Sequence, residues 1–135
     1  MLLEKGWAKL HGTYLRTEGG LPSFACMHLL NTPTSSYCSK EYTVDEAKKD
    51  ELWKILRKAD RRGHHVMAAS EGQGEEKSSL GVISGHAYSL IAAKEIQVEG
   101  QSTIVRLCML RNPWGSGEWT GDWSDKSPLW TPELR

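Results

Sequence analysis

The chain has 135 residues and carries 17 basic against 17 acidic side chains, so its formal net charge is zero with histidine neutral. This balance argues against nucleic-acid or anionic-membrane binding driven by bulk charge, and the length suits one domain or part of a larger one. No apolar run approaches the roughly 18 residues that cross a bilayer, and Glu4 and Lys5 interrupt the opening apolar residues too early for a signal peptide. We therefore expect a cytoplasmic protein with no nucleic-acid partner and no membrane span.

The amino-terminal segment has the spacing of an amphipathic helix. Leu3, Trp7, Leu10 and Tyr14 recur every three or four residues with charged residues between them. Since no capping residue precedes this pattern, we expect the natural helix to begin upstream of the chain. Residues 17–40 contain glycines, prolines and a Ser/Thr cluster, which predicts an irregular connection.

Residues 43–62 give the clearest helical pattern. Thr43 and Glu46 have the spacing of a capping box, and Gly63 supplies a stop signal. The apolar side chains share one stripe, and the basic ones lie off it on a face that we expect to be solvated. The stripe consists of Leu52, Ile55, Leu56 and Ala59, and the basic residues are Lys48, Lys49, Lys54, Arg57, Lys58 and Arg61.

Three later segments have strand character. Residues 65–69 predict a short strand, and residues 82–98 and 103–111 predict longer ones joined by the short loop 99–101 as an antiparallel hairpin. Facing residues in such a hairpin have numbers with a constant sum, which this loop sets near 198 or 199. His86 and Asn112 sum to 198, so we expect them to be neighbours at the open end of the hairpin.

A paired imidazole and amide have a specific chemical use. An amide oxygen that accepts from one ring nitrogen fixes the orientation and tautomer of the imidazole, so that the other nitrogen can act as a base toward a thiol. The alternative interpretation is structural, with His86 as an ordinary strand-end histidine and Asn112 as a turn residue before a proline.

The residues around this pair resemble the calpain family of papain-like cysteine proteases. The motifs are GHAYS at 85–89, RNPWG at 111–115 and EWTG followed by WSD within 118–125, together with LLEKGWAKLHG at 2–12. The resemblance implies an α+β fold. Residues 1–40 would be the end of the first protease subdomain with its connection, and residues 41–135 would be a truncated second subdomain with antiparallel strands and a packed helix.

The resemblance also assigns roles to single residues. It implies that His86 is the general base, that Asn112 orients it and that Trp114 covers their hydrogen bond. Glu118 and Asp125 match two carboxylate ligands of a calcium site in the second subdomain, although both could be surface acids. Calcium takes six to eight oxygen ligands, so two carboxylates are an incomplete site.

The nucleophile of the family is absent. None of Cys26, Cys38 and Cys108 stands in the Gln-Gly-x-Cys-Trp-like setting of the family, and they form neither a CxxC pair nor a disulfide framework. Cys108 falls within the last predicted strand, where we expect it to pack as a small apolar residue. Ser116 is a further departure, because many relatives have an acidic residue there.

These observations favour part of a cysteine endopeptidase core, inactive by itself, that acts on protein or peptide substrates with a cysteine-bearing subdomain outside the chain. Two other interpretations stay open. One is a non-catalytic calpain-like interaction module that binds partners on its Trp-rich surface, and the other is a truncated calcium sensor.

Overall fold

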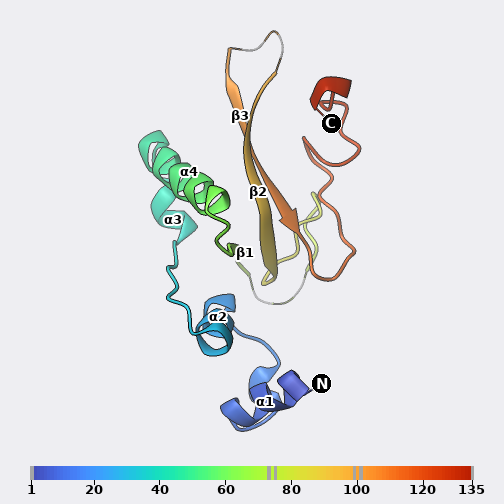
Figure 1. Cartoon of the computed structure of the whole chain (residues 1–135). Coiled ribbons are helices and arrows are strands. Elements are labelled where there is room, and N and C mark those ends of the chain that lie inside the picture. Colours follow the sequence, from blue (N-terminus) through green and yellow to red (C-terminus); the bar gives the residue numbers. More distant parts are fainter. Residues whose placement is uncertain (1, 73, 75, 99, 101, 135) are drawn as a thin grey trace. The chain divides into compact units, whose positions relative to one another are not determined.

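A computed structural model describes residues 2–72, 74, 76–98, 100 and 102–134. They form two compact units, residues 1–38 and residues 39–135 (Figure 1). Helices together with a three-stranded antiparallel sheet are compatible with the expected α+β class. Within the described residues, no helix is both long and apolar enough to cross a membrane.

The first unit is helical. Helix α1 spans Leu2–His11, which confirms the predicted helix for Leu3, Trp7 and Leu10, whereas Tyr14 lies beyond its end. Ala8 is its buried residue. A single 3-10 turn follows at Leu15–Thr17, and helix α2 spans Pro22–Leu30. The prediction of an irregular connection over residues 17–40 is therefore wrong for α2. This helix begins at a proline, which suits a first turn, and ends at Asn31 in the left-handed conformation with φ of 49°.

The second unit opens with helix α3, Ser39–Tyr42, and the longer helix α4, Glu46–Arg61. The predicted capping box is wrong, because Asp45 is the N-cap and its carboxylate accepts the backbone N–H of Lys48 at 2.7 Å. The predicted stop at Gly63 is confirmed by its φ of +66°. The N–H of Gly63 reaches the carbonyl of Asp60 at 3.1 Å, as in a Schellman end.

The sheet has the strand order β1-β2-β3, with β1 at Met67–Ala69, β2 at Ala87–Gln97 and β3 at Ile104–Arg111. Both pairings are antiparallel, which confirms the predicted hairpin. The residue numbers of facing pairs in β2 and β3 sum to 201 near the loop and to 200 beyond a bulge between Leu90 and Ala92. The predicted sum of 198 or 199 is therefore wrong. Of the predicted loop, Glu99 and Gln101 lie outside the described residues.

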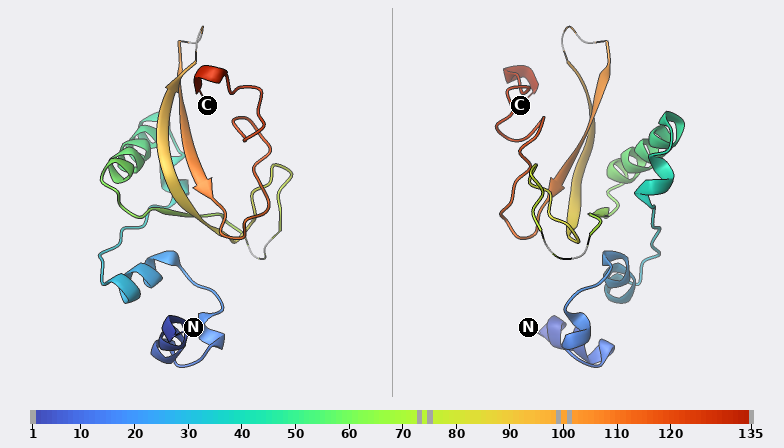
Figure 2. Two further views of the ribbon diagram at one scale, coloured as in Figure 1. Left: turned by 45° about the vertical axis from the view of Figure 1, so that its right-hand side comes forward. Right: turned by 180° about the vertical axis from the view of Figure 1, so that it is seen from behind.

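Helix α4 packs on β2, and in both views of Figure 2 the β2–β3 hairpin stands between α4 and the carboxy-terminal segment. Trp53, which the predicted stripe omitted, is the buried residue of α4, and its Nε1–H donates to Glu95 at 2.6 Å. Arg57 is half-buried and donates to the carbonyl of Ala93. The expectation of a fully solvated basic face is therefore wrong at Arg57, because this side chain covers an open stretch of the edge of β2.

The segment after β3 has no strand in its described part and ends in a 3-10 turn at Pro132–Leu134. Its organisation comes from its tryptophans. The rings of Trp123 and Trp130 meet edge to face with centroids 5.0 Å apart, and Nε1–H of Trp130 donates to the carbonyl of Ser124 at 2.8 Å. A hydrogen bond from Thr120 N–H to the carbonyl of Leu80, at 2.9 Å, joins this segment to the chain that precedes β2.

Candidate active site

His86 and Asn112 lie just outside the strands of the hairpin. His86 precedes β2 and is only 6% exposed, and Asn112 directly follows β3. Their side chains meet, with Nε2 of His86 at 2.9 Å from Oδ1 of Asn112. The expected neighbourhood of the two residues is therefore present, although the predicted register is one to three residues off.

The amide of Asn112 is oriented by its own turn. Its Nδ2 donates to the backbone carbonyl of Ser116 at 2.6 Å, and its Oδ1 accepts the backbone N–H of Trp114 at 3.0 Å. If Oδ1 and Nδ2 were exchanged, Nδ2 would face the N–H of Trp114, which is also a donor, and Oδ1 would face the carbonyl of Ser116, which is also an acceptor. Oδ1 must therefore face His86, and Nε2 of a neutral His86 must carry the proton, which leaves the lone pair of the ring on Nδ1.

Two aromatic rings flank the imidazole. The centroid of Trp114 lies 4.5 Å from that of His86, at an interplanar angle of 55°, and Trp114 is itself 50% exposed. Tyr88 meets the imidazole edge to face at 5.0 Å. Tyr88 follows His86 by two residues, so both side chains emerge on one side of the extended chain. The indole and the phenol therefore both contact the ring that bonds to Asn112.

Sequence reasoning assigned no role to Tyr88, to Ser70 or to the carbonyl of Ser116. The period of two residues from His86 could have indicated Tyr88. No local signal indicates Ser70, since it lies 16 residues before His86, yet its hydroxyl accepts the backbone N–H of His86 at 3.0 Å. Ser116 contributes its backbone carbonyl to the site.

Known proteins of one family match the chain over nearly its whole length. The family described as calpain family cysteine protease matches residues 1–134. The chain belongs to the calpain family. It is 35% identical to calpain-9 of Mus musculus over 133 residues, 37% identical to the calpain-type cysteine protease DEK1 of Arabidopsis thaliana over 138, and 34% identical to the calpain-2 catalytic subunit of Gallus gallus over 147.

These alignments cover 96%, 99% and 99% of the chain, but only 18%, 6% and 19% of the three relatives. The chain thus spans less than a fifth of the length of these calpains. Its family membership concerns this segment, and the activity of a whole calpain is a separate matter.

Within this calpain-family segment, Cys108 is poorly placed to serve His86. It pairs with Ala93 in the hairpin, and Ala93 follows His86 by seven residues. At about 3.3 Å per residue this separation is about 20 Å. Burial of the thiol and, secondarily, the carboxylate of Asp60 raise the pKa of Cys108, which is the opposite of what a nucleophilic thiol requires. Cys108 nevertheless keeps an exposed surface, so the expectation that it packs as an apolar residue is wrong.

The two predicted calcium ligands do not complete a site. Glu118 and Asp125 are both exposed, on the irregular segment after β3. In the part of the chain that the structure describes, no three His, Cys, Asp or Glu side chains come together as a metal-binding group. A calcium ion needs more oxygen ligands than these two carboxylates supply, so the described residues alone do not fit a closed calcium site.

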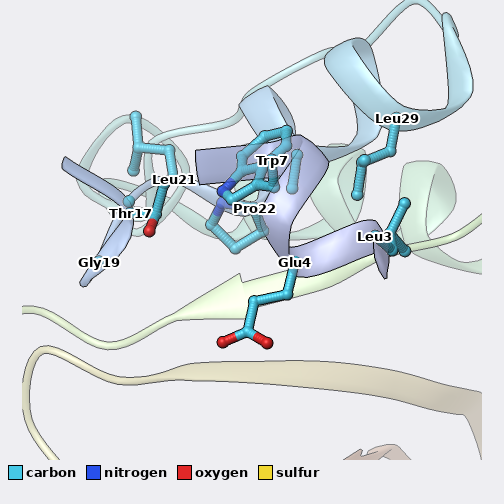
Figure 3. Close-up of a pocket in the computed structure, with 10 residues that line it drawn as sticks. Leu3, Glu4, Trp7, Thr17, Gly19, Leu21, Pro22 and Leu29 are labelled. Atoms are coloured by element: carbon cyan, nitrogen blue, oxygen red, sulfur yellow. The ribbon is translucent and has the colours of Figure 1, made fainter. Parts of the chain in front are cut away.

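A cavity of about 510 Å³ lies elsewhere, in the first unit. Figure 3 shows Trp7 and Pro22 side by side in it, with Leu3 and Leu29 to one side of them and Leu21 to the other. Apolar side chains dominate its lining, which includes neither His86 nor Asn112.

Proposed function

We propose that this chain supplies the general base and its orienting amide to a calpain-type cysteine endopeptidase core. The observation that supports the proposal is the contact between Nε2 of His86 and Oδ1 of Asn112, whose amide is itself held by two backbone groups. A base for a thiol needs a neutral imidazole with a lone pair directed at the thiol and its other nitrogen anchored. The contacts of Asn112 meet the second requirement.

In the proposed reaction, Nδ1 of His86 takes the proton from a cysteine thiol, and the resulting thiolate attacks the carbonyl carbon of a peptide bond. The imidazolium then gives this proton to the departing amine, which leaves a thioester on the cysteine. Water hydrolyses the thioester with His86 again as the base. Asn112 keeps its bond to Nε2–H throughout, and Trp114 covers one face of the imidazole.

The cysteine of this reaction would come from outside the chain. Cys108 stands about 20 Å along the hairpin from His86, and Cys26 lies in helix α2 of the first unit. We infer that residues 41–135 are a papain-like second protease subdomain and residues 1–40 the end of the first. A substrate cleft would then be shared with the missing cysteine-bearing subdomain, and calcium would bind at Glu118 and Asp125 only with further oxygen ligands from outside the chain.

Two assays test the proposal. The purified chain should show no cysteine-dependent peptide hydrolysis. When the chain is joined behind the cysteine-bearing subdomain of a calpain relative, hydrolysis should appear, and His86→Ala should lower kcat about 10² to 10⁴-fold, the usual share of general acid–base catalysis. Ser79→Ala, in the exposed loop before β2, is the matched control and should keep the activity. A joined protein that folds and binds peptide but never hydrolyses it, or one indifferent to His86→Ala, would instead favour a non-catalytic module.

A further inference from the structure

Ser70 lies opposite His86 at the end of the β1–β2 ladder. The last pair of this ladder is Ala69 with Ala87, so the same register sets Ser70 against His86. The N–H of Ser70 donates to the carbonyl of His86 at 2.9 Å, as a continuing strand would. In the opposite direction the N–H of His86 donates to the side-chain Oγ of Ser70, at 3.0 Å. A hydroxyl thus takes the place of the backbone acceptor expected in a ladder.

After Ser70 the chain continues alongside the same segment, and the N–H of Gly85 donates to the carbonyl of Glu71 at 3.4 Å. Without the hydroxyl, the backbone N–H of a residue that is 6% exposed would lose its acceptor. The single proton of the hydroxyl goes to the carbonyl of Ile83, the closer of the two carbonyl oxygens within its reach. Ser70 therefore binds the backbone at both ends of the segment 83–86.

Tyr88 holds the same segment from the other side. Its hydroxyl accepts the N–H of Ile83 at 2.8 Å while its ring meets the imidazole of His86 edge to face. Ile83 is 3% exposed, so the segment is anchored in one of the few buried positions of the second unit. With both backbone groups of Ile83 and both of His86 bonded, the direction in which the imidazole leaves the chain is fixed.

We propose that Ser70 is a positioning residue for the base: its hydroxyl holds the backbone of His86 so that Nε2 meets Oδ1 of Asn112. The inference rests on the proposed function, since it gives Ser70 a task in preparing His86 for proton transfer. A bond of 2.9 Å between two side chains on different segments of the chain depends on both backbones, and a small displacement of either lengthens it. The turn of Asn112 fixes one side of this bond, and Ser70 fixes the other.

The test is the exchange of the imidazole proton of His86 with water, measured by NMR on the ¹⁵N-labelled 135-residue chain at about pH 8, where an ordinary imidazole is neutral. In the unmodified chain Nε2–H should be protected, and His86→Gln identifies its signal. Ser70→Ala should speed this exchange about fivefold, the effect of losing one typical hydrogen bond. Ser70→Thr, which retains a hydroxyl, should restore the protection, and Ser79→Ala should leave it unchanged.

The amide proton of Leu107, inside β3, is the reference for a purely structural role. If Ser70→Ala speeds exchange at Leu107 and at His86 equally, or at neither, the positioning role is overturned. If the unmodified chain shows no protected proton on His86, the bond on which the proposed function rests is wrong, which separates the two failures. Should Ser70→Ala not fold, Ser70→Cys carries the same expectation, because a thiol is a weak donor and acceptor.

Discussion

Trp53 joins helix α4 to the sheet, and its replacement by phenylalanine should destabilise the second unit by about 2 kcal/mol. Trp53 is 8% exposed, its Nε1–H donates to Glu95 of β2 at 2.6 Å, and the guanidinium of Arg106 from β3 lies 5.6 Å from its ring. Phenylalanine keeps an aromatic ring but has no N–H. The change therefore removes the hydrogen bond and leaves the Glu95 carboxylate with its more distant contact to Arg106, at 3.7 Å.

The magnitude follows from the setting of the bond. A hydrogen bond to a charged group contributes about 1.5–3 kcal/mol, and a cation–π contact at an exposed site about 0.5–1 kcal/mol. The side chains of Glu95 and Arg106 are 39% and 41% exposed, so water screens both and the lower halves of these ranges apply. With part of the cation–π contact retained by phenylalanine, about 2 kcal/mol remains, or about 1 M in the urea midpoint at an m-value near 2 kcal/mol/M.

Urea unfolding followed by far-ultraviolet circular dichroism measures this change independently of the other tryptophans. Trp119→Phe is the matched control, because Trp119 is 42% exposed and donates only within its own turn, to Asp122, so it should cost less than about 1 kcal/mol. A double-mutant cycle with Glu95→Ala should give a coupling energy of about 1 kcal/mol. Additivity of Trp53→Phe and Glu95→Ala within about 0.5 kcal/mol would refute the assigned bond.

Three further changes test other parts of the structure. Gly81→Ala should prevent stable folding and show no cooperative urea transition, because at φ of +96° its Cβ would lie 2.0 Å from a backbone carbonyl oxygen. Gly100→Ala is the control: at φ of +78° with nothing within 4 Å of its Cβ, it should lower the free energy of unfolding by only about 1 kcal/mol. Asp45→Ala should cost about 1 kcal/mol through loss of the α4 cap, and Asp45→Asn should retain most of it, by the same measurement. Because burial first and Asp60 second raise the pKa of Cys108, its alkylation rate should reach half-maximum at a higher pH than that of an ordinary thiol, and Asp60→Asn should lower that pH; an unchanged profile would contradict the assignment.

Two local signals in the sequence predicted helical structure correctly. The helical spacing of Leu3, Trp7 and Leu10 predicted α1, and Gly63 predicted the end of α4. Helix α2 was missed because its apolar residues show no preferred face, although Pro22 and Asn31 mark its two ends. At the start of α4, Thr43 and Asp45 both suit an N-cap, and only the observed bond to Asp45 decides between them.

The predicted contact of His86 with Asn112 survives an error in register for a physical reason. The last facing pair of the hairpin is Ser89 with Arg111, so both site residues lie beyond the ladder. Beyond that point the chains are no longer tied to a constant sum of residue numbers. The bulge near Leu90 and the turn after Asn112 determine the positions of the His86 and Asn112 side chains. A strand pattern with a period of two residues predicts neither the bulge nor the turn.

The two sides of the site differ in how far the sequence can reveal them. The amide of Asn112 is held by Trp114 and Ser116, both within four residues, so a short motif contains everything that orients it. The backbone of His86 is held by Ser70, across a polar segment without periodicity, and this contact exists only because β1 pairs with β2 in one register. A resemblance in short motifs can therefore indicate His86 and Asn112 as the proposed base and its orienting amide. The contact of Ser70 with His86 becomes visible only when the pairing of the strands is known.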